Sequence, residues 1–483
     1  MQRGDADRRA IIVGAGPNGL AAGIVLAQAG WSVRLFEASE TVGGGARSDE
    51  LTEPGFIHDV CSAVYPLGLG SPLFRSLGLE KYGLEYIHPP LALAHPLDDD
   101  TAVVLDRSMQ RTVETLDHAI DAQRHRARFE WLAEQWPVVA EEVLSPPHVP
   151  RSLARGRVLA RFGVAGLRSA DGFARSTYVG ERARALFAGI AAHSTLPLNQ
   201  PPSAAIGLLL AAAGHGVGWP IVRGGAQRLA DALAALLREL GGEISTGQRI
   251  ASLAALPKAD AYLFDTAPLH LLPIAGDQLP TGYCRQLDRF RYGAGSFKVD
   301  WALSEPIPWR SEVCREAGTL HLGGSLDEIA AAEAAASRGE HAEQPFVLLS
   351  QPSVFDDRRA PAGEHTAWAY CHVPNGSTVD MTHRIEAQVE RFAPGFGDVI
   401  IARHTMNAQE LERRNANYVG GDINAGMPNL RQLLMRPAPR WSPHCTPNRR
   451  IFLCSSSTPP GGGVHGMCGY HAAQAVLRSM GGG

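Results

Sequence analysis

The chain has 483 residues, of which 45% are hydrophobic, 19% are charged and 52 are glycine. This composition supports a substantial buried core and excludes a disordered chain, and the lack of a three-residue glycine period excludes collagen. The formal net charge of −4 offers no global field for a polyanion, so we expect no nucleic-acid partner. The longest clean apolar run, 204–213, is about half of the ~20 residues that a membrane span needs.

The cysteines and the first residues bear on metal content and compartment. The seven cysteines are scattered without a CxxC pair, which excludes a zinc ribbon and a thioredoxin-type redox pair, and we predict no metal site. Residues 1–9 are charged and lack the long apolar region of a signal peptide. We therefore expect a reduced, cytoplasmic protein.

The first forty residues predict a dinucleotide-binding unit. Strand, glycine turn, helix and second strand are expected in order at 10–13, 14–19, 20–29 and 33–36. Gly14 permits a tight turn, Gly16 lets the backbone approach a pyrophosphate, and Gly19 allows close helix packing. Glu37 ends the second strand, where a carboxylate accepts hydrogen bonds from ribose hydroxyls. The glycine spacing alone is a weak signal, but this order of elements favours dinucleotide binding over a glycine-rich turn.

A second glycine-rich segment follows at once. Residues 41–48 read TVGGGARS, which resembles a segment of the flavoproteins that include amine oxidases, protoporphyrinogen oxidase and carotenoid desaturases. The resemblance implies that FAD is the cofactor, that these glycines run beside its pyrophosphate, and that Arg47 approaches the phosphates or the flavin. A plain NAD dehydrogenase would not need this segment.

Two later segments complete the predicted cofactor domain. Residues 450–454 predict a strand, followed by a glycine-rich loop and a helix at 472–480, so a second helix N-terminus faces the cofactor. The resemblance implies that this loop lies under the flavin. A helix at 230–240 and a strand from Gly241 match the middle FAD segment, in which Ile250 covers the adenine side.

The later part of the chain resembles the phytoene dehydrogenase-like group of this superfamily. The resemblance covers most of the chain and is weakest at 107–190. It is carried by segments at 296–303, 318–323, 370–374, 417–422 and 459–466. No second strand–glycine–helix unit is present for NAD(P)H, so another acceptor must reoxidise the flavin.

The expected fold is α/β, with a Rossmann-type FAD-binding domain assembled from discontinuous segments and an α+β substrate or cap domain. The FAD-binding domain is predicted at 1–80, 215–290 and 440–483. The cap is predicted at 81–214 and 291–439. The first of these segments looks largely helical, with helix-type apolar spacing over 113–144, and the second contains strand-like runs at 295–303 and 345–349. The candidate FAD-binding residues are Gly14, Gly16, Pro17, Asn18, Gly19, Glu37, Ala38, Gly44, Gly45, Ala46, Arg47, Ile250, Ser456, Gly463, Val464, His465, Gly466 and Met467.

Two residues are candidate catalytic groups. Lys298 is one of only three lysines and stands among apolar strand neighbours, where burial near flavin N5 would let it hold a water or act as a base. The alternative is a strand lysine whose amine reaches solvent. His465 lies within the flavin-covering loop and would stabilise reduced-flavin charge or shuttle a proton. Its alternative is a histidine that only shapes the site. Cys468 carries no recognisable motif for covalent flavin attachment.

The expected activity is an FAD-dependent oxidoreductase that transfers hydride from a C–H bond of an apolar or unsaturated small molecule to flavin N5. A flavin-dependent cis–trans isomerase and an amine oxidase are alternatives of the same class. A flavin-bearing scaffold or partner-binding protein without turnover is an alternative of another class. The arginines of 151–184 form either a solvated helical face, which we favour, or a weak peripheral membrane contact. The sequence leaves the oligomeric state open.

Overall fold

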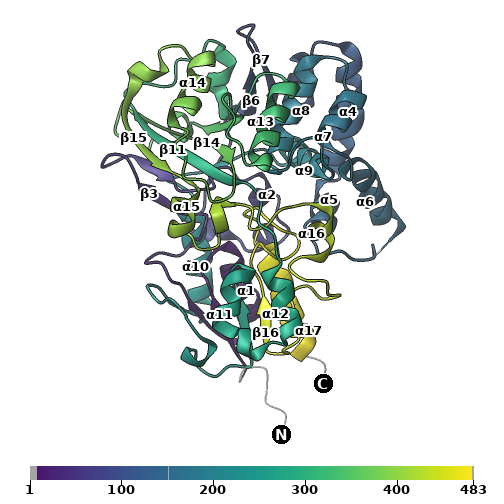
Figure 1. Cartoon of the computed structure of the whole chain (residues 1–483), viewed down its shortest axis with the longest axis vertical. Helices are drawn as coiled ribbons and strands as arrows, with labels where there is room; N and C mark the ends of the chain where they lie inside the picture. The colour runs from purple at the N-terminus through teal and green to yellow at the C-terminus, as the bar shows by residue number, and fades with distance from the viewer. Residues whose placement is uncertain (1–7, 151, 481–483) are drawn as a thin grey trace.

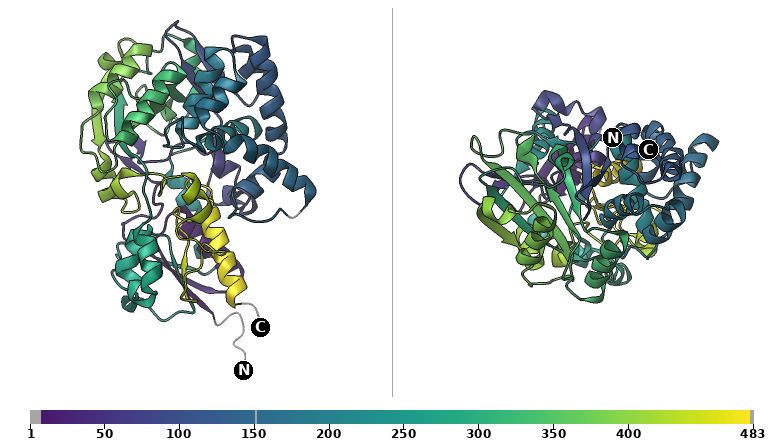
Figure 2. Two further views of the ribbon diagram at one scale, coloured as in Figure 1. Left: turned by 45° about the vertical axis from the view of Figure 1, so that its right-hand side comes forward. Right: turned by 90° about the horizontal axis from the view of Figure 1, so that it is seen from above.

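The computed structural model of the chain describes residues 8–150 and 152–480, and Figure 1 shows its elements. The outermost residues of the predicted FAD-binding domain, 1–7 and 481–483, and Arg151 of the arginine-rich segment lie outside this description. In Figures 1 and 2 the elements form two lobes, one above the other, and β1 and α17 both belong to the lower lobe.

A five-stranded parallel sheet forms the lower lobe, in the order β16-β10-β1-β2-β9. Its strands are β1 (Arg9–Val13), β2 (Ser32–Phe36), β9 (Glu243–Ser245), β10 (Ala261–Phe264) and β16 (Ile451–Leu453). All five fall within the three segments predicted for the FAD-binding domain. The strand expected from Gly241 ends early at Ser245, so Ile250 lies in the loop that follows.

Helices cover both faces of the parallel sheet, because consecutive side chains of a strand point to opposite faces. Ile12 belongs to the core on the side of α1 (Pro17–Gln28), α10 (Gln227–Glu239) and α17 (Met467–Met480). Ile11 belongs to the core on the side of α11 (Pro268–Ala275) and α12 (Thr281–Asp288). Helix α1 begins three residues earlier than predicted because Pro17 suits the first turn, where its missing N–H is not needed.

A seven-stranded mixed sheet forms the upper lobe, in the order β15-β11-β14-β13-β12-β6-β7. Its strands are β6 (Leu91–Pro96), β7 (Ala102–Leu105), β11 (Gly295–Leu303), β12 (Ala317–Leu322), β13 (Val347–Ser350), β14 (His365–Val373) and β15 (Ile400–Met406). Leu349 faces a core that includes α14 (Thr382–Phe392), and Leu348 faces the core of α8 (Glu181–Ala192) and α13 (Leu326–Arg338). These strands lie within the two segments predicted for the cap, whose exact boundaries stay a prediction.

The helix-type spacing predicted over 113–144 corresponds to helical structure, which is divided among three helices. Pro137 stands at the second position of α5, where proline is tolerated, and its missing N–H would break a helix interior. The helices of this region are α3 (Met109–Glu114), α4 (Ala119–Glu134), α5 (Trp136–Val143), α6 (Leu153–Gly166), α7 (Ala170–Thr177), α8 (Glu181–Ala192) and α9 (Ser203–Gly216).

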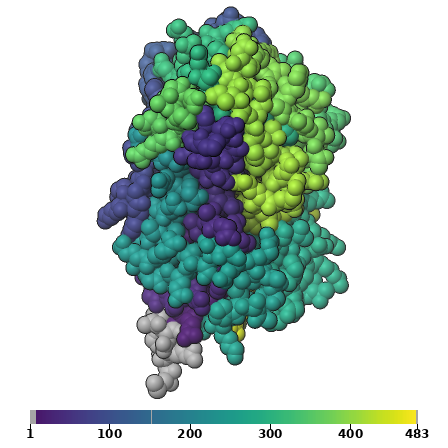
Figure 3. All heavy atoms as spheres, turned by 90° about the vertical axis from the view of Figure 1, so that its left-hand side faces the viewer, coloured from purple at the N-terminus to yellow at the C-terminus, as the bar shows by residue number. Residues whose placement is uncertain are grey.

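Short elements connect the lobes. They are β3 (Ser48–Glu50), β4 (Ile57–Asp59), α2 (Pro66–Leu69), β5 (Tyr86–Ile87), β8 (Ile221–Val222), α15 (Ala408–Arg414) and α16 (Leu430–Met435). The β3–β4 hairpin reaches up from the lower lobe, and Asp49 forms an ion pair with Arg414 of α15. In Figure 3 this purple hairpin lies against the yellow-green residues of β15 and α15.

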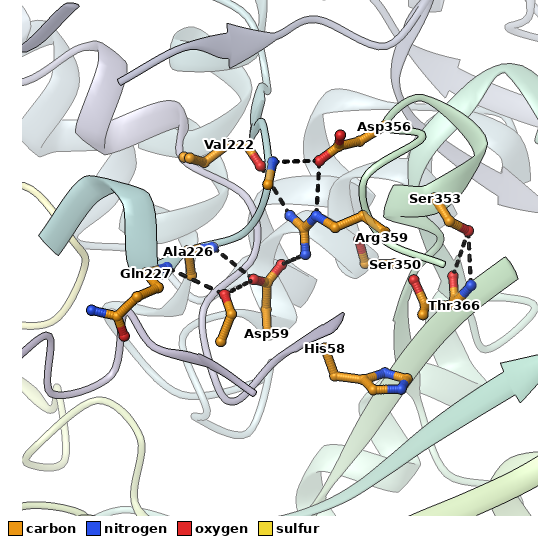
Figure 4. Close-up of polar contacts among 12 residues, drawn as sticks. His58, Asp59, Val222, Ala226, Gln227, Ser350, Ser353, Asp356, Arg359 and Thr366 are labelled. Carbon is orange, nitrogen blue, oxygen red and sulfur yellow. Dashed lines mark hydrogen bonds and ion pairs between the residues drawn. The ribbon is translucent and has the colours of Figure 1, made fainter. Parts of the chain in front are cut away.

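A fully buried arginine fixes the hairpin to the upper lobe. The guanidinium of Arg359 forms ion pairs with Asp59 at 3.0 Å and with Asp356 at 2.9 Å, and it donates to the carbonyl of Val222 at 3.0 Å (Figure 4). Asp59 also accepts from the backbone N–H of Ala226 at 2.7 Å. Segments far apart in the chain therefore meet at this one side chain.

Among the helices of residues 8–150 and 152–480, none combines the length and the apolar character that crossing a membrane requires.

Candidate functional site

The glycine turn at 14–19 is packed so closely that larger residues do not fit. A Cβ on Gly19 would lie 2.0 Å from the carbonyl oxygen of Gly14, and one on Gly16 would lie 2.7 Å from Oδ2 of Asp265. Gly14 has a φ of 104°, a conformation that L side chains rarely adopt. The turn leaves the backbone of Gly16 exposed toward a cavity, as an approaching pyrophosphate requires.

Glu37 is held in place by backbone donors. Its Oε2 accepts the N–H of Ala15 at 2.7 Å and its Oε1 accepts the N–H of Ser39 at 2.9 Å. The carboxylate lines a cavity of about 370 Å³, the Glu37 cavity, between β2 and the segment after β9. The predicted residues that line this cavity are Gly14, Gly16, Glu37, Ala38, Gly44, Arg47 and Ile250.

A second cavity continues from the first toward the closing loop. This Ser456 cavity of about 90 Å³ shares Gly16, Gly44 and Asp265 with the Glu37 cavity. Asn18 donates to Oγ of Ser456 at 3.1 Å, which joins the first glycine motif to the loop after β16. The predicted residues along this cavity are Gly16, Pro17, Asn18, Gly44, Gly45, Ser456, Gly463 and Val464.

A third cavity lies beyond the second and is largely apolar. This Trp368 cavity of about 220 Å³ shares Gly45, Tyr418 and Val464 with the Ser456 cavity. Trp368 and Tyr370 stack with ring centroids 5.9 Å apart, and both line the cavity. Among the described residues that line it, none is Asp, Glu, Lys or Arg.

The remaining predicted cofactor residues support the site without lining these three cavities. Gly19 packs on Gly14, Ala46 is fully buried, and Gly466 packs against Phe74. Met467 is the first residue of α17 and lines a separate surface cavity. Direct contact of these four residues with a cofactor stays a prediction.

Arg47 braces the second glycine segment. Its Nε donates to the carbonyl of Gly44 at 2.8 Å, and burial lowers the pKa of its guanidinium from the ordinary value. The side chain lines the Glu37 cavity and not the Trp368 cavity, and its contact with FAD stays a prediction.

His465 begins α17. Its Nδ1 accepts the N–H of Met467 at 3.0 Å, and its carbonyl accepts from the hydroxyl of Ser71 at 2.7 Å. Burial lowers the pKa of His465 to about 4, so the ring is neutral at pH 7 and supplies no positive charge. The ring lines an outer cavity rather than the Ser456 cavity, which favours the interpretation that it shapes the site.

Lys298 is buried, so the alternative of a solvent-reaching amine is wrong. Its side chain is 3% exposed, and its ammonium forms an ion pair with the fully buried Asp300. Burial alone would raise the pKa of Asp300, but Lys298, His404 and His58 hold it below its usual value. Nζ of Lys298 lies 5.2 Å from the ring centre of Trp368, which lines the Trp368 cavity. A catalytic role for Lys298 stays a prediction.

Sequence reasoning missed Asp265 as a site residue. It follows β10 at the edge of the sheet where the carboxyl ends of parallel strands meet, the edge at which such folds bind ligands. Its Oδ2 accepts the N–H of Gly19 at 2.9 Å. Burial raises the pKa of Asp265 well above its usual value, and the nearby Glu37 carboxylate acts in the same direction. An acid directly after a buried strand was the available signal.

The arrangement fits FAD. A carboxylate for ribose hydroxyls, a glycine cradle that a Cβ would fill and the N-terminus of α1 follow one another along linked cavities. A dinucleotide with its flavin end toward Gly463 and Val464 would border the Trp368 cavity.

Comparisons with known proteins agree with this geometry. Residues 12–77 match a family model described as an NAD(P)-binding Rossmann-like domain. The chain is 24% identical to pyridine nucleotide-disulfide oxidoreductase domain-containing protein 2 of Rattus norvegicus, over 98% of this chain and 93% of that protein.

Solved structures share the fold of both lobes. Putrescine oxidase bound to putrescine is 17% identical, with a TM-score of 0.61 over 97% of this chain and 98% of that one. A fatty acid isomerase from P. acnes is 14% identical, with a TM-score of 0.56 over 98% of this chain and 99% of that one. Over nearly its whole length the chain is therefore similar to an oxidoreductase domain-containing protein, and it has the same fold as putrescine oxidase and the fatty acid isomerase.

Proposed function

We propose that the protein is an FAD-dependent oxidoreductase that oxidises a C–H bond of an apolar or unsaturated small molecule. The observation that carries this proposal is the continuity of the cofactor cavities with the Trp368 cavity. Because the described lining of that cavity has no charged side chain, it offers an apolar molecule a site beside the flavin end.

The chain's own residues would bind and orient the cofactor. Glu37 would accept hydrogen bonds from the ribose hydroxyls, and the turn at 14–19 would bind the pyrophosphate. Gly463 and Val464 would border the flavin. When bound, FAD would accept hydride at N5 from the substrate. Trp368, Tyr370 and the other cavity walls would orient the substrate and exclude water, which lets the reacting atoms approach in a fixed geometry.

Two alternatives of the same class make different demands on this cavity. An amine oxidase gains support from the aromatic walls of Trp368 and Tyr370, and putrescine oxidase has this fold. An ammonium group entering the cavity would, however, find no carboxylate on its described lining. A cis–trans isomerase needs the same apolar cavity without net oxidation, and the fatty acid isomerase shares the fold.

Anaerobic titration of the FAD-loaded protein distinguishes these activities. A panel of unsaturated hydrocarbons, apolar acids and primary amines would be added while the flavin spectrum is followed. Bleaching by an apolar compound, and not by amines, is the expected result. Bleaching by amines alone would favour the amine oxidase, and isomerised product after prior photoreduction would favour the isomerase. Photoreduced flavin that reoxidises, but that no compound bleaches, would favour the scaffold without turnover.

Peripheral membrane contact through 151–184 also stays a proposal. Arg155, Arg175, Arg182 and Arg184 already form ion pairs with protein carboxylates, which leaves fewer charges for anionic lipid. Leu153 of α6 is 87% exposed and supplies an apolar contact. Flotation with anionic liposomes tests the contact, and absence of salt-sensitive binding would overturn it.

A further inference from the structure

A fourth cavity connects the Trp368 cavity with the helical side of the molecule. This Arg436 cavity of about 380 Å³ lies between α6, α9 and α16 and the closing loop at 459–465. It shares Leu67, His193, Ile206, Leu209, Asn424 and Gly462 with the Trp368 cavity. A single elongated ligand therefore has one path from α16 to the flavin end of the site.

Most of the cavity lining is apolar, but Arg436 and Glu142 are charged, and Glu142 is already paired with Arg155 and His148. Arg436 directly follows α16 and is only 3% exposed. Its Nε donates to the carbonyl of Ser457 at 3.3 Å, and its Nη2 donates to the carbonyl of Ala425 at 3.1 Å. Within the described part of the chain, its Nη1 makes no hydrogen bond, although the side chain lines the cavity.

No carboxylate forms an ion pair with Arg436 among residues 8–150 and 152–480. The carboxylate that acts on it electrostatically is Asp422, whose oxygens accept the backbone N–H groups of Gly293 at 2.7 Å, Gly426 at 2.8 Å and Asn424 at 2.9 Å. Burial lowers the pKa of Arg436, and Cys468 and then Asp422, which lies beyond ion-pair distance, oppose that effect. The guanidinium is thus a buried cation whose nearby acid is engaged elsewhere.

A buried cation without a paired anion is costly, and a guanidinium fork matches a carboxylate in geometry and charge. We propose that Arg436 binds the carboxylate of the substrate, whose apolar chain fills the Arg436 and Trp368 cavities. The substrate class is then an apolar carboxylic acid. This inference rests on the proposed function, since it assigns the substrate class of the same site.

Arg436 also lies near the cofactor, because Ala425 and Ser457 line the Ser456 cavity. If Arg436 acts on the flavin, its replacement would change the midpoint potential of the bound flavin. If Arg436 binds the substrate, its replacement would change the preference for a carboxylate over a neutral ligand of the same chain length. The two roles therefore have different readouts.

The test uses the FAD-loaded full chain with dodecanoate and dodecan-1-ol as probes. Binding is followed by the fluorescence of Trp219 and Trp368, which line the Trp368 cavity, so the readout does not need turnover. We expect dodecanoate to bind about tenfold or more tightly than dodecan-1-ol, because a charge-assisted hydrogen bond is lost in the alcohol. Arg436→Gln should abolish this preference, and Arg436→Lys should retain part of it.

Arg431→Gln is the matched control, because Arg431 is an exposed arginine on α16. It should leave the preference for dodecanoate unchanged. Equal binding of the two probes by the wild-type protein would overturn the inference, even where Arg436→Gln fails to fold. The inference would also be overturned if both Arg436→Lys and Arg436→Gln kept the wild-type preference for dodecanoate. It would be overturned as well if Arg436→Gln shifted the flavin potential while leaving that preference unchanged. Failure of the protein to bind FAD would instead overturn the proposed function.

Discussion

The carboxylate of Asp265 accepts the backbone N–H of Gly19 at 2.9 Å, although the two residues are 246 positions apart in the chain. This bond ties the edge of β10 to the glycine turn beside the predicted pyrophosphate site. Since burial raises the pKa of Asp265, the carboxyl group holds a proton more strongly than in the unfolded chain.

Replacing Asp265 separates its hydrogen bond from its charge. Asp265→Ala should destabilise the protein by about 1–3 kcal/mol in urea unfolding, because the buried N–H of Gly19 loses its acceptor. Asp265→Asn keeps an acceptor oxygen and should therefore retain this hydrogen bond.

The same variant tests the charge of Asp265. Because the folded pKa of Asp265 lies above the unfolded one, the stability that this group gives the wild-type protein is lost as the pH rises through the folded pKa. Asp265→Asn should therefore gain relative to wild type with rising pH, and the opposite trend would contradict this interpretation.

Gly45 and Tyr418 provide a paired test of the glycine cradle. A Cβ on Gly45 would lie 2.0 Å from the hydroxyl oxygen of Tyr418, so Gly45→Ala should lower both the thermal midpoint and FAD loading. The double variant Gly45→Ala with Tyr418→Phe removes the clashing oxygen and should recover part of the thermal midpoint. If the thermal midpoint does not recover, the destabilisation by Gly45→Ala does not arise from a clash with the hydroxyl of Tyr418.

Arg359 should be essential to the junction of the lobes. Arg359→Met would leave Asp59 and Asp356 buried without their cation, which should cost about 3–5 kcal/mol of unfolding free energy. Arg338→Met is the control, since the Arg338–Glu340 pair is exposed and should contribute little. Equal unfolding free energies for the two variants in urea would show that the buried pairs do not stabilise the junction.

His372 and Glu333 predict a pH-dependent contribution to stability. Burial lowers the pKa of His372, but the carboxylate of Glu333, 2.8 Å from Nδ1, raises it to a net value above 6.5. Because the folded pKa is raised, this stabilisation is complete below the unfolded pKa and is lost as the pH rises through the folded one. Glu333→Gln should thus show its largest loss of unfolding free energy below pH 6.5, with a smaller loss at alkaline pH. A loss that grows with pH would exclude this account.

Local patterns in the sequence predicted the parallel-sheet lobe well. The predicted dinucleotide site lies within one contiguous unit, so the spacing of its residues along the chain determines their arrangement in space. These residues are Gly14, Gly16, Gly19 and Glu37. The strand at 295–303 was also predicted with the bounds of β11, whose residues Phe297, Val299, Trp301 and Leu303 are apolar at alternate positions. Helix bounds were less accurate where a proline, such as Pro137, allowed a new helix to begin.

The rest of the site depends on contacts between distant segments, which no local pattern encodes. Asp265 acts on Gly19 through the order of strands in the sheet, and Arg436 meets Ser457 and Ala425 only after the closing loop has folded. The charge state of His465 follows from burial, which its loop sequence does not reveal. These residues required the three-dimensional arrangement.

The most direct test of the account is the visible absorbance spectrum of the purified protein, measured before and after addition of FAD and removal of excess cofactor. We predict bound flavin bands in the wild-type protein and their loss in Gly19→Ala, whose Cβ would lie 2.0 Å from the carbonyl oxygen of Gly14. A folded wild-type protein that retains no flavin after incubation with FAD would contradict the central claim.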